Sequence, residues 1–198
     1  MKYLALGDSY TIGEGVPEDQ TWPVLLAEEF QNKGFNFEKP KIIAKTGWTT
    51  GELLQAIQQE DLSDNYQLVS LLIGVNNQYR GQSLENYRKE FEYLVKKAIT
   101  LAQNEPKRLF VVSIPDYSVT SFAKEKNPEK IRIEIEDFNK TNKEVAKDYG
   151  IVYVDITPLS RKAQHDQSLL AEDQLHPSGK MYKEWISLMS QMIANNFK

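Results

Sequence analysis

The chain has 198 residues, the usual size of one domain, and we expect residues 1–198 to form a single domain. It contains no cysteine, which excludes a disulfide framework, a thiolate metal site and a cysteine nucleophile. The 24 Lys and Arg side chains against 28 Asp and Glu give a formal net charge of -4 without a basic block, so we expect no nucleic-acid partner.

Short apolar runs alternate with longer amphipathic runs along the chain. In chain order they predict a strand at Lys2–Leu6, a helix at Trp22–Gln31, a strand at Lys41–Ala44, a helix at Thr50–Glu60, a strand at Gln67–Ile73, a helix at Ser83–Asn104, a strand at Leu109–Ile114, a helix at Pro128–Tyr149, a strand at Ile151–Val154 and a helix at Ser178–Asn195. This alternation predicts an α/β fold, a three-layer αβα sandwich around a parallel sheet of about five strands. The strand order does not follow from the sequence.

Residues at the ends of the predicted elements support these boundaries. Thr21 and Ser178 are candidate helix N-caps, and Pro23 suits the first turn of its helix. Gly150 is placed to end the long helix before it, and Pro115 stops the fourth strand.

Small and polar residues follow the predicted strands. Gly7–Thr11 follows the first strand, Lys45–Trp48 the second, Gly74–Asn77 the third, and Asp173–Pro177 lies beyond the fifth. Because ligands bind at the carboxyl ends of the strands in an open α/β sheet, we expect these four segments to meet there.

These segments hold the groups that acyl transfer requires. Ser9 can act as the nucleophile and His176 as its base, with Asp173 near enough in the same loop to orient the imidazole. The oxyanion could be held by the Ser9 N–H, the Gly47 N–H and the side-chain amide of Asn76. Gly47 would let a substrate approach the backbone without a Cβ in the way.

The same four segments resemble the sequence blocks of the GDSL, or SGNH, family of serine hydrolases. Leu6–Thr11 is similar to the first block, with Ser9 at the nucleophile position, and Gly47 matches the glycine of the second. Gly74–Asn76 resembles the third block, and Asp173–Pro177 matches the Asp-x-x-His-Pro of the fifth. The blocks occur in the family's order over nearly the whole chain.

This resemblance implies a flavodoxin-like SGNH hydrolase fold and a carboxylic ester hydrolase that needs no cofactor and no metal. The implied substrate is a small-molecule ester with a short acyl or acetyl group, or a lysophospholipid. Family members also act on thioesters and acetylated sugars, so the acyl chain and the alcohol stay open, and so does the oligomeric state.

Two positions depart from the family pattern. The third block commonly ends in Asn-Asp, where this chain has Asn77. Since the family's Asp is thought to brace the loop, we expect the amide to keep the geometry and lose a charge. Tyr10 replaces the Leu of the Gly-Asp-Ser-Leu motif, at a position that varies within the family.

Residues beside the candidate catalytic groups are expected to line the substrate pocket. These are Asp8, Trp48, Asn77 and Tyr79, although core packing would explain the two aromatic residues equally well. Asp116 and Tyr117 follow the fourth strand and are expected at the rim. The polar segment 118–127 is either a lid or an ordinary loop.

Other functions share some of these features. The glycines and hydroxyls that follow the first strand could bind phosphate or flavin as in flavodoxin-like proteins, but that would leave Asp173 and His176 unexplained. An acyltransferase would use the same triad, and a non-catalytic binder could have the same fold. Taken singly, Ser9 could be a turn residue and His176 a helix-end residue, while His165 lies in a polar stretch and is expected to face solvent.

We expect a cytoplasmic protein without a transmembrane segment. The first apolar run is too short for a signal peptide and ends at Asp8. No stretch approaches the roughly 18 apolar residues that a membrane span requires. A leader removed before Met1 would leave no trace in this sequence.

Overall fold

The computed structural model describes residues 1–63 and 65–194. A sheet of five strands lies at the centre of this described part, in the order β2-β1-β3-β4-β5, with every neighbouring pair parallel. The strands are β1 (Tyr3–Gly7), β2 (Lys41–Ala44), β3 (Leu68–Leu72), β4 (Leu109–Val112) and β5 (Val152–Val154). The predicted parallel sheet is confirmed.

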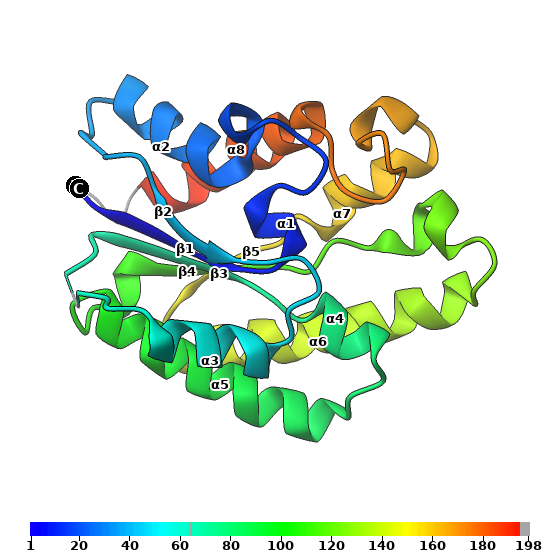
Figure 1. Ribbon diagram of the computed structural model, residues 1–198, viewed down its shortest axis with the longest axis horizontal. Helices are drawn as coiled ribbons and strands as arrows, with labels where there is room; N and C mark the ends of the chain where they lie inside the picture. The colour runs from blue at the N-terminus through cyan, green and yellow to red at the C-terminus, as the bar shows by residue number, and fades with distance from the viewer. Residues whose placement is uncertain (64, 195–198) are drawn as a thin grey trace.

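Helices cover both faces of the sheet and complete the predicted αβα sandwich. Figure 1 shows α2 and α8 on one face and α3, α5 and α6 on the other. The helices are α1 (Ser9–Ile12), α2 (Trp22–Asn32), α3 (Thr50–Gln59), α4 (Val75–Tyr79), α5 (Leu84–Leu101), α6 (Pro128–Asp148), α7 (Thr157–Ser160) and α8 (Gly179–Ile193). None of these helices is both long and apolar enough to span a membrane.

The core lies between the sheet and each helical layer. Every residue of β1 and β3 is buried, as expected for central strands of a parallel sheet that is covered on both faces. Trp22 of α2 and Trp185 of α8 are fully buried, and the Trp22 ring packs edge-on against Phe110 of β4 at a centroid distance of 6.3 Å. Truncating such an aromatic side chain to Ala typically costs about 3–5 kcal/mol.

Local hydrogen bonds explain where several helices begin. Thr49 and Glu52 form a capping box at the start of α3, each side chain bonding the other residue's backbone N–H. Ser178 caps α8, since its hydroxyl accepts the N–H of Met181. Thr21 stands at the predicted N-cap of α2, but its hydroxyl donates to the Glu18 carbonyl instead of capping the helix.

The long helix α5 ends earlier than the sequence predicted. It stops at Leu101 instead of Asn104, because Gln103 and Asn104 adopt left-handed backbone conformations with φ of 63° and 58°. The N–H of Asn104 then bonds the Ile99 carbonyl at 2.9 Å and closes the helix end. The predicted end of the last helix at Asn195 lies outside the described residues.

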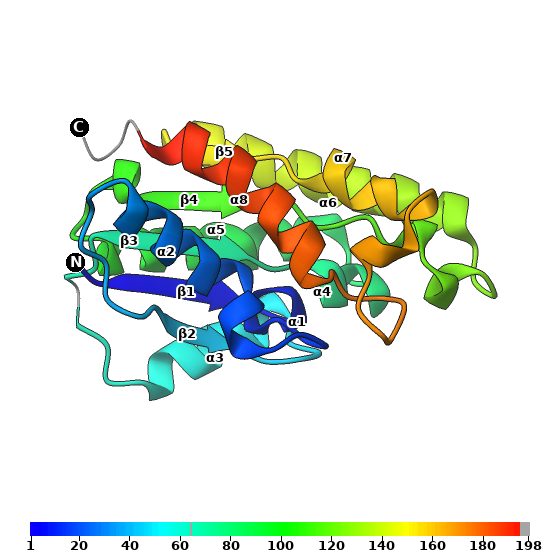
Figure 2. The same ribbon diagram turned by 90° about the horizontal axis from the view of Figure 1, so that it is seen from above.

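Three short helices that the sequence analysis did not predict shape one end of the sheet. They are α1, α4 and α7, and Figure 2 shows them beyond the carboxyl ends of the strands. Gly7, the last residue of β1, pairs with Ala44 of β2 and with Leu72 of β3. Three neighbouring strands therefore end at the same level, which brings the segments that follow them together.

Candidate active site

Ser9 is the first residue of α1 and follows β1 after a tight turn. The turn needs Gly7, because a Cβ there would collide with the Thr11 hydroxyl and the Leu72 carbonyl. Asp8 caps the short helix, its Oδ1 accepting the N–H of Tyr10 at 3.1 Å. These contacts fix Ser9 at the carboxyl end of β1, with only 5% of its surface exposed.

His176 is held by Asp173, which lies in the same loop. The Asp173 Oδ2 lies 2.6 Å from the His176 Nδ1, and its Oδ1 accepts the backbone N–H groups of Leu175 and His176 at 2.9 Å each. Gln174 between them adopts φ +58°. One carboxylate therefore organises both the loop backbone and the imidazole.

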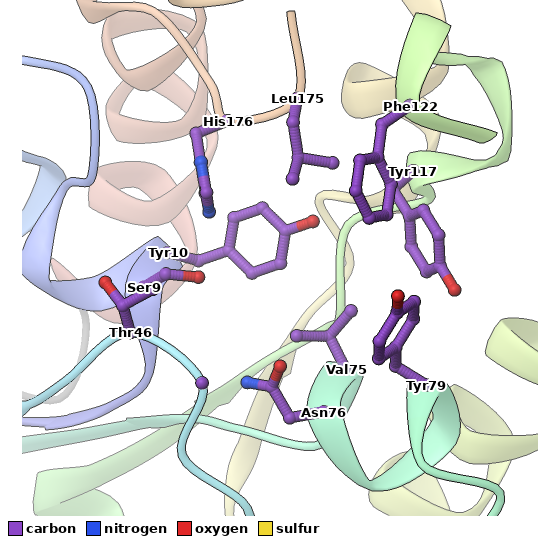
Figure 3. A pocket seen from close by; sticks show the side chains of 11 residues that line it. Ser9, Tyr10, Thr46, Val75, Asn76, Tyr79, Tyr117, Phe122, Leu175 and His176 are labelled. Carbon is purple, nitrogen blue, oxygen red and sulfur yellow. The ribbon is translucent and has the colours of Figure 1, made fainter. Parts of the chain in front are cut away.

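The charge of Asp173 is favoured by this arrangement. Partial burial raises the pKa of Asp173, but hydrogen bonds from His176 and Leu175 outweigh it and lower the pKa below its ordinary value. The carboxylate can thus accept the Nδ1 hydrogen of the His176 ring, which leaves Nε2 free to accept a proton. Figure 3 shows the His176 ring and the Ser9 side chain at the same end of a cavity.

The three candidate oxyanion donors come from three separate segments. The N–H groups of Ser9 and Gly47 have no hydrogen-bond partner among the described residues. The amide nitrogen of Asn76 donates one hydrogen to the Trp48 carbonyl at 2.9 Å, which orients the amide and leaves its second hydrogen available. Asn76 and Gly47 both line the cavity that contains Ser9.

Arg80 supports the Gly47 segment, a role that the sequence did not reveal. Gly47 has φ +86°, a conformation that L side chains rarely adopt. The Arg80 guanidinium donates to the Gly47 carbonyl at 2.6 Å and pairs with Glu52 at 3.2 Å. With its carbonyl held in this way, Gly47 has little freedom to turn its peptide away from the cavity.

The cavity beside Ser9 has a volume of about 180 Å³. Of the residues predicted for catalysis or the pocket, it brings together Ser9, Gly47, Asn76, Tyr79 and His176. The remaining lining residues are Tyr10, Thr46, Val75, Tyr117, Phe122 and Leu175. Thr46 and Leu175 lie inside the motif segments, whereas no sequence pattern pointed to Phe122.

Three residues expected in the substrate pocket do not line the cavity. Asp8 and Asn77 are completely buried beneath it. Trp48 packs against the hydrophobic core with its side chain, and its contribution to the site is the backbone carbonyl that holds Asn76. These residues thus support the cavity wall from behind.

Three aromatic side chains form the end of the cavity opposite Ser9. Figure 3 shows Tyr79, Tyr117 and Phe122 there, and the Phe122 ring lies 6.1–6.2 Å from the other two ring centroids. The ammonium of Lys126 sits 4.7 Å from the Phe122 ring centroid and 5.0 Å from that of Tyr79. The segment 118–127, for which the sequence left a lid and an ordinary loop as alternatives, therefore borders the cavity through Phe122. Asp116 was expected at the rim but is buried, and its Oδ2 accepts a hydrogen bond from the Arg161 Nε at 2.7 Å.

Asp8, which precedes the candidate nucleophile Ser9, is a buried carboxyl group with a strongly shifted pKa. Complete burial raises its pKa from the ordinary value of 3.8 to about 7, although the Tyr10 N–H bond acts in the opposite direction. Its Oδ2 has no hydrogen-bond partner in the described part of the chain. In the same part, no three His, Cys, Asp or Glu side chains are grouped closely enough to hold a metal ion.

Solved structures with a similar fold include several hydrolases. The chain resembles TesA with a TM-score of 0.74 and 17% identity, covering 99% of both chains. It resembles a lipase/acylhydrolase from Enterococcus faecalis with a TM-score of 0.74 and 19% identity over 98% of this chain and 95% of that one. It resembles the acetylxylan esterase Axe2 from Geobacillus stearothermophilus with a TM-score of 0.73 and 18% identity, over 97% of this chain and 93% of that one. At these identities the likeness shows the fold alone.

A comparison with curated proteins gave no match. The family comparison did give a match, and it spans most of the chain, from β1 to α8. Residues 5–184 match the GDSL-like Lipase/Acylhydrolase family, and the chain therefore belongs to this family of carboxylic ester hydrolases.

Proposed function

We propose that this protein hydrolyses short-chain carboxylic esters through an acyl-enzyme intermediate on Ser9. The observation that carries the proposal is the 2.6 Å contact between Asp173 and His176 at the end of the cavity that holds Ser9. A carboxylate, an imidazole and a hydroxyl form the triad in which the imidazole takes the serine proton and the carboxylate orients the imidazole.

The reaction follows from the chemistry of these groups. The Ser9 hydroxyl attacks the ester carbonyl while the His176 Nε2 takes its proton. Negative charge develops on the carbonyl oxygen, where the N–H groups of Ser9 and Gly47 and the Asn76 amide are available to stabilise it. His176 then protonates the leaving alcohol.

The second half of the reaction restores the enzyme. Water gives a proton to His176 and attacks the acyl-enzyme, and collapse of the second tetrahedral intermediate releases the acid and returns the proton to Ser9. Asp173 stays ionised throughout and stabilises the imidazolium that forms in each half. An alcohol in place of water would give acyl transfer by the same steps.

The size of the cavity suits a substrate with a short acyl group or a small alcohol. Its volume of about 180 Å³ is below the ~300–1,000 Å³ of sites that enclose drug-sized ligands. Val75, Leu175 and Phe122 give it apolar walls, which suit a few methylene groups.

The test is hydrolysis of 4-nitrophenyl esters from acetate to palmitate by the wild type and by Ser9→Ala. We expect wild-type turnover that is greatest for short chains, and none above background for Ser9→Ala. Ser187→Ala, which removes an exposed hydroxyl on α8, serves as the matched control and should behave like the wild type. Equal activity in wild type and Ser9→Ala would refute the proposed nucleophile. Adding alcohols and measuring ester against free acid separates transfer from hydrolysis.

A further inference from the structure

Tyr10 occupies a fixed position next to the nucleophile. It lies in α1 with 3% of its surface exposed, and its ring packs edge-on against the His176 ring at a centroid distance of 5.6 Å. Its carbonyl accepts hydrogen bonds from the Trp22 indole at 3.1 Å and from the Tyr182 hydroxyl at 3.0 Å. The backbone that carries this ring is therefore tied to both α2 and α8.

The hydroxyl of Tyr10 points into the cavity and has no partner there. Figure 3 shows it directed away from Ser9, toward the space between Leu175 and Tyr117. No hydrogen bond to this hydroxyl occurs within residues 1–63 and 65–194. By contrast, the Tyr117 hydroxyl donates to Gln78 at 2.9 Å, and the Tyr79 hydroxyl lies 3.4 Å from the Lys126 ammonium.

The Tyr10 hydroxyl remains a neutral donor at working pH. Burial, reinforced by the nearby Asp8, raises the pKa of Tyr10 well above its ordinary value. A neutral phenol can both donate and accept, so it can pair with a hydroxyl, an ether or a carbonyl oxygen of a bound molecule.

The binding of a substrate depends on whether the substrate offers a hydrogen-bond partner to the Tyr10 hydroxyl. Val75, Leu175 and Phe122 give the cavity that contains this hydroxyl apolar walls. A hydrocarbon group that fills the cavity would displace water from the Tyr10 hydroxyl and give it no bond in return, which is costly. An oxygen at the right position would replace that water, and sites with such a polar group reject analogues that lack the matching oxygen.

We propose that the Tyr10 hydroxyl is a specificity-determining group that selects esters carrying a hydrogen-bonding oxygen in the part of the substrate that occupies this cavity. The inference rests on the proposed function and narrows its substrate class, from short-chain esters in general to oxygenated ones such as hydroxy-, alkoxy- or sugar-derived esters. It concerns selectivity between substrates and leaves the reaction at Ser9 unchanged.

Tyr10→Phe removes the hydroxyl and keeps the ring against His176. The probes are three pairs of esters in which one oxygen replaces one methylene group: 4-nitrophenyl 3-methoxypropanoate against pentanoate, 4-nitrophenyl ethoxyacetate against pentanoate, and 2-methoxyethyl acetate against butyl acetate. The first two pairs place the oxygen in the acyl group and the third places it in the alcohol. For each pair, the measured quantity is the ratio of kcat/KM for the oxygenated ester to that for the hydrocarbon ester.

We expect Tyr10→Phe to lower this ratio about three- to tenfold for at least one pair, the range that one net hydrogen bond supplies. The hydrocarbon ester should be turned over as fast as by the wild type or faster. Tyr93→Phe, at an exposed position on α5, is the matched control and should leave all three ratios unchanged.

Two outcomes would overturn the inference while the proposed function stands. One is a ratio that stays within twofold of the wild type in all three pairs. The other is an equal fall for both members of each pair, which would reduce Tyr10 to packing against His176. If the wild type turns over none of the esters, the proposed function fails and the inference fails with it, and this case is recognised before any variant is measured.

Discussion

Replacing Asp8 by Asn should change how the stability of the fold depends on pH. Complete burial raises the pKa of Asp8 from 3.8 to about 7 in the folded protein, whereas the unfolded chain releases this proton near the ordinary value. Between these two pH values the folded state keeps a proton that the unfolded state has lost. The free energy of unfolding therefore contains a contribution from Asp8 that is fully present below pH 4 and is lost as pH rises to 7.

The size of this contribution follows from the shift. A difference of about three pKa units at about 1.4 kcal/mol per unit gives a total loss of about 4 kcal/mol, most of it between pH 4 and pH 7 and the remainder by about pH 8. Asp8→Asn has no carboxyl to titrate, so it should lack this loss. Its free energy of unfolding relative to that of the wild type should therefore rise by about 4 kcal/mol across the same interval. Any further difference that the new amide causes does not depend on pH and does not change this rise.

Urea unfolding followed by tryptophan fluorescence at pH 4, 5, 6, 7 and 8 measures this difference. The carboxylates with lowered pKa, such as Asp173 and Glu52, are present in both proteins, so their effects cancel in the comparison. Asp19→Asn, at an exposed position, is the control and should run parallel to the wild type. A difference between Asp8→Asn and wild type that varies by less than 1 kcal/mol over this range would refute the argument.

Three other substitutions test the candidate site. Asn76→Ala should lower kcat about 100- to 1,000-fold, or about 3 kcal/mol, by removing an oxyanion donor, and a loss under tenfold in steady-state assays would assign it another role. Asp173→Asn should lower kcat/KM less than His176→Ala, because the imidazole is kept and the Asn Oδ1 can still accept the backbone N–H of His176; the opposite ranking would contradict this. Asn77→Asp should destabilise the fold by about 1–3 kcal/mol at pH 7 in urea unfolding, since it replaces a buried donor by an acceptor, and unchanged stability would remove Asn77 from its bracing role.

The sequence predicted the strands well because their signal is local. Central strands such as β1 and β3 are buried on both faces, so nearly every residue in them is apolar and the run is visible without any partner. The short helices α1 and α4 were missed because a helix of four or five residues has no apolar periodicity to detect. They form where the chain must turn sharply after a strand, at Gly7 and Gly74.

The candidate catalytic residues were predicted for a different reason. Ser9, Gly47 and Asn76 closely follow β1, β2 and β3, whose carboxyl ends meet at one edge of the sheet. Asp173 and His176 lie well beyond β5, after α7, and were predicted from the Asp-x-x-His-Pro pattern. No such rule predicts which residues form the walls of the cavity. Phe122 reaches the cavity because a loop after β4 folds back over Tyr117 and Tyr79, and that depends on contacts between segments far apart in the chain.

Asn77 shows how a departure from a family pattern can be compensated elsewhere. Its amide nitrogen donates to the Thr50 hydroxyl at 2.6 Å and to Gln82, while its oxygen accepts the Thr50 N–H at 3.1 Å. The Thr50 hydroxyl has one hydrogen, and it donates this hydrogen to Glu90 of α5. An Asp at position 77 would need the same hydrogen and would place a second carboxylate in the buried network.

The amide at position 77 and the acid at position 90 are therefore complementary. The sequence suggested that Asn77 loses a charge at this position. The network instead keeps one carboxylate, that of Glu90, which comes from α5 and not from α4. Because Gln82 also bonds Glu90 at 3.0 Å, the brace joins α3, α5 and the segment that carries Asn76. Asn76, the candidate oxyanion donor, is thus positioned by residues from two helices, and none of these partners is identifiable from the motif that contains it.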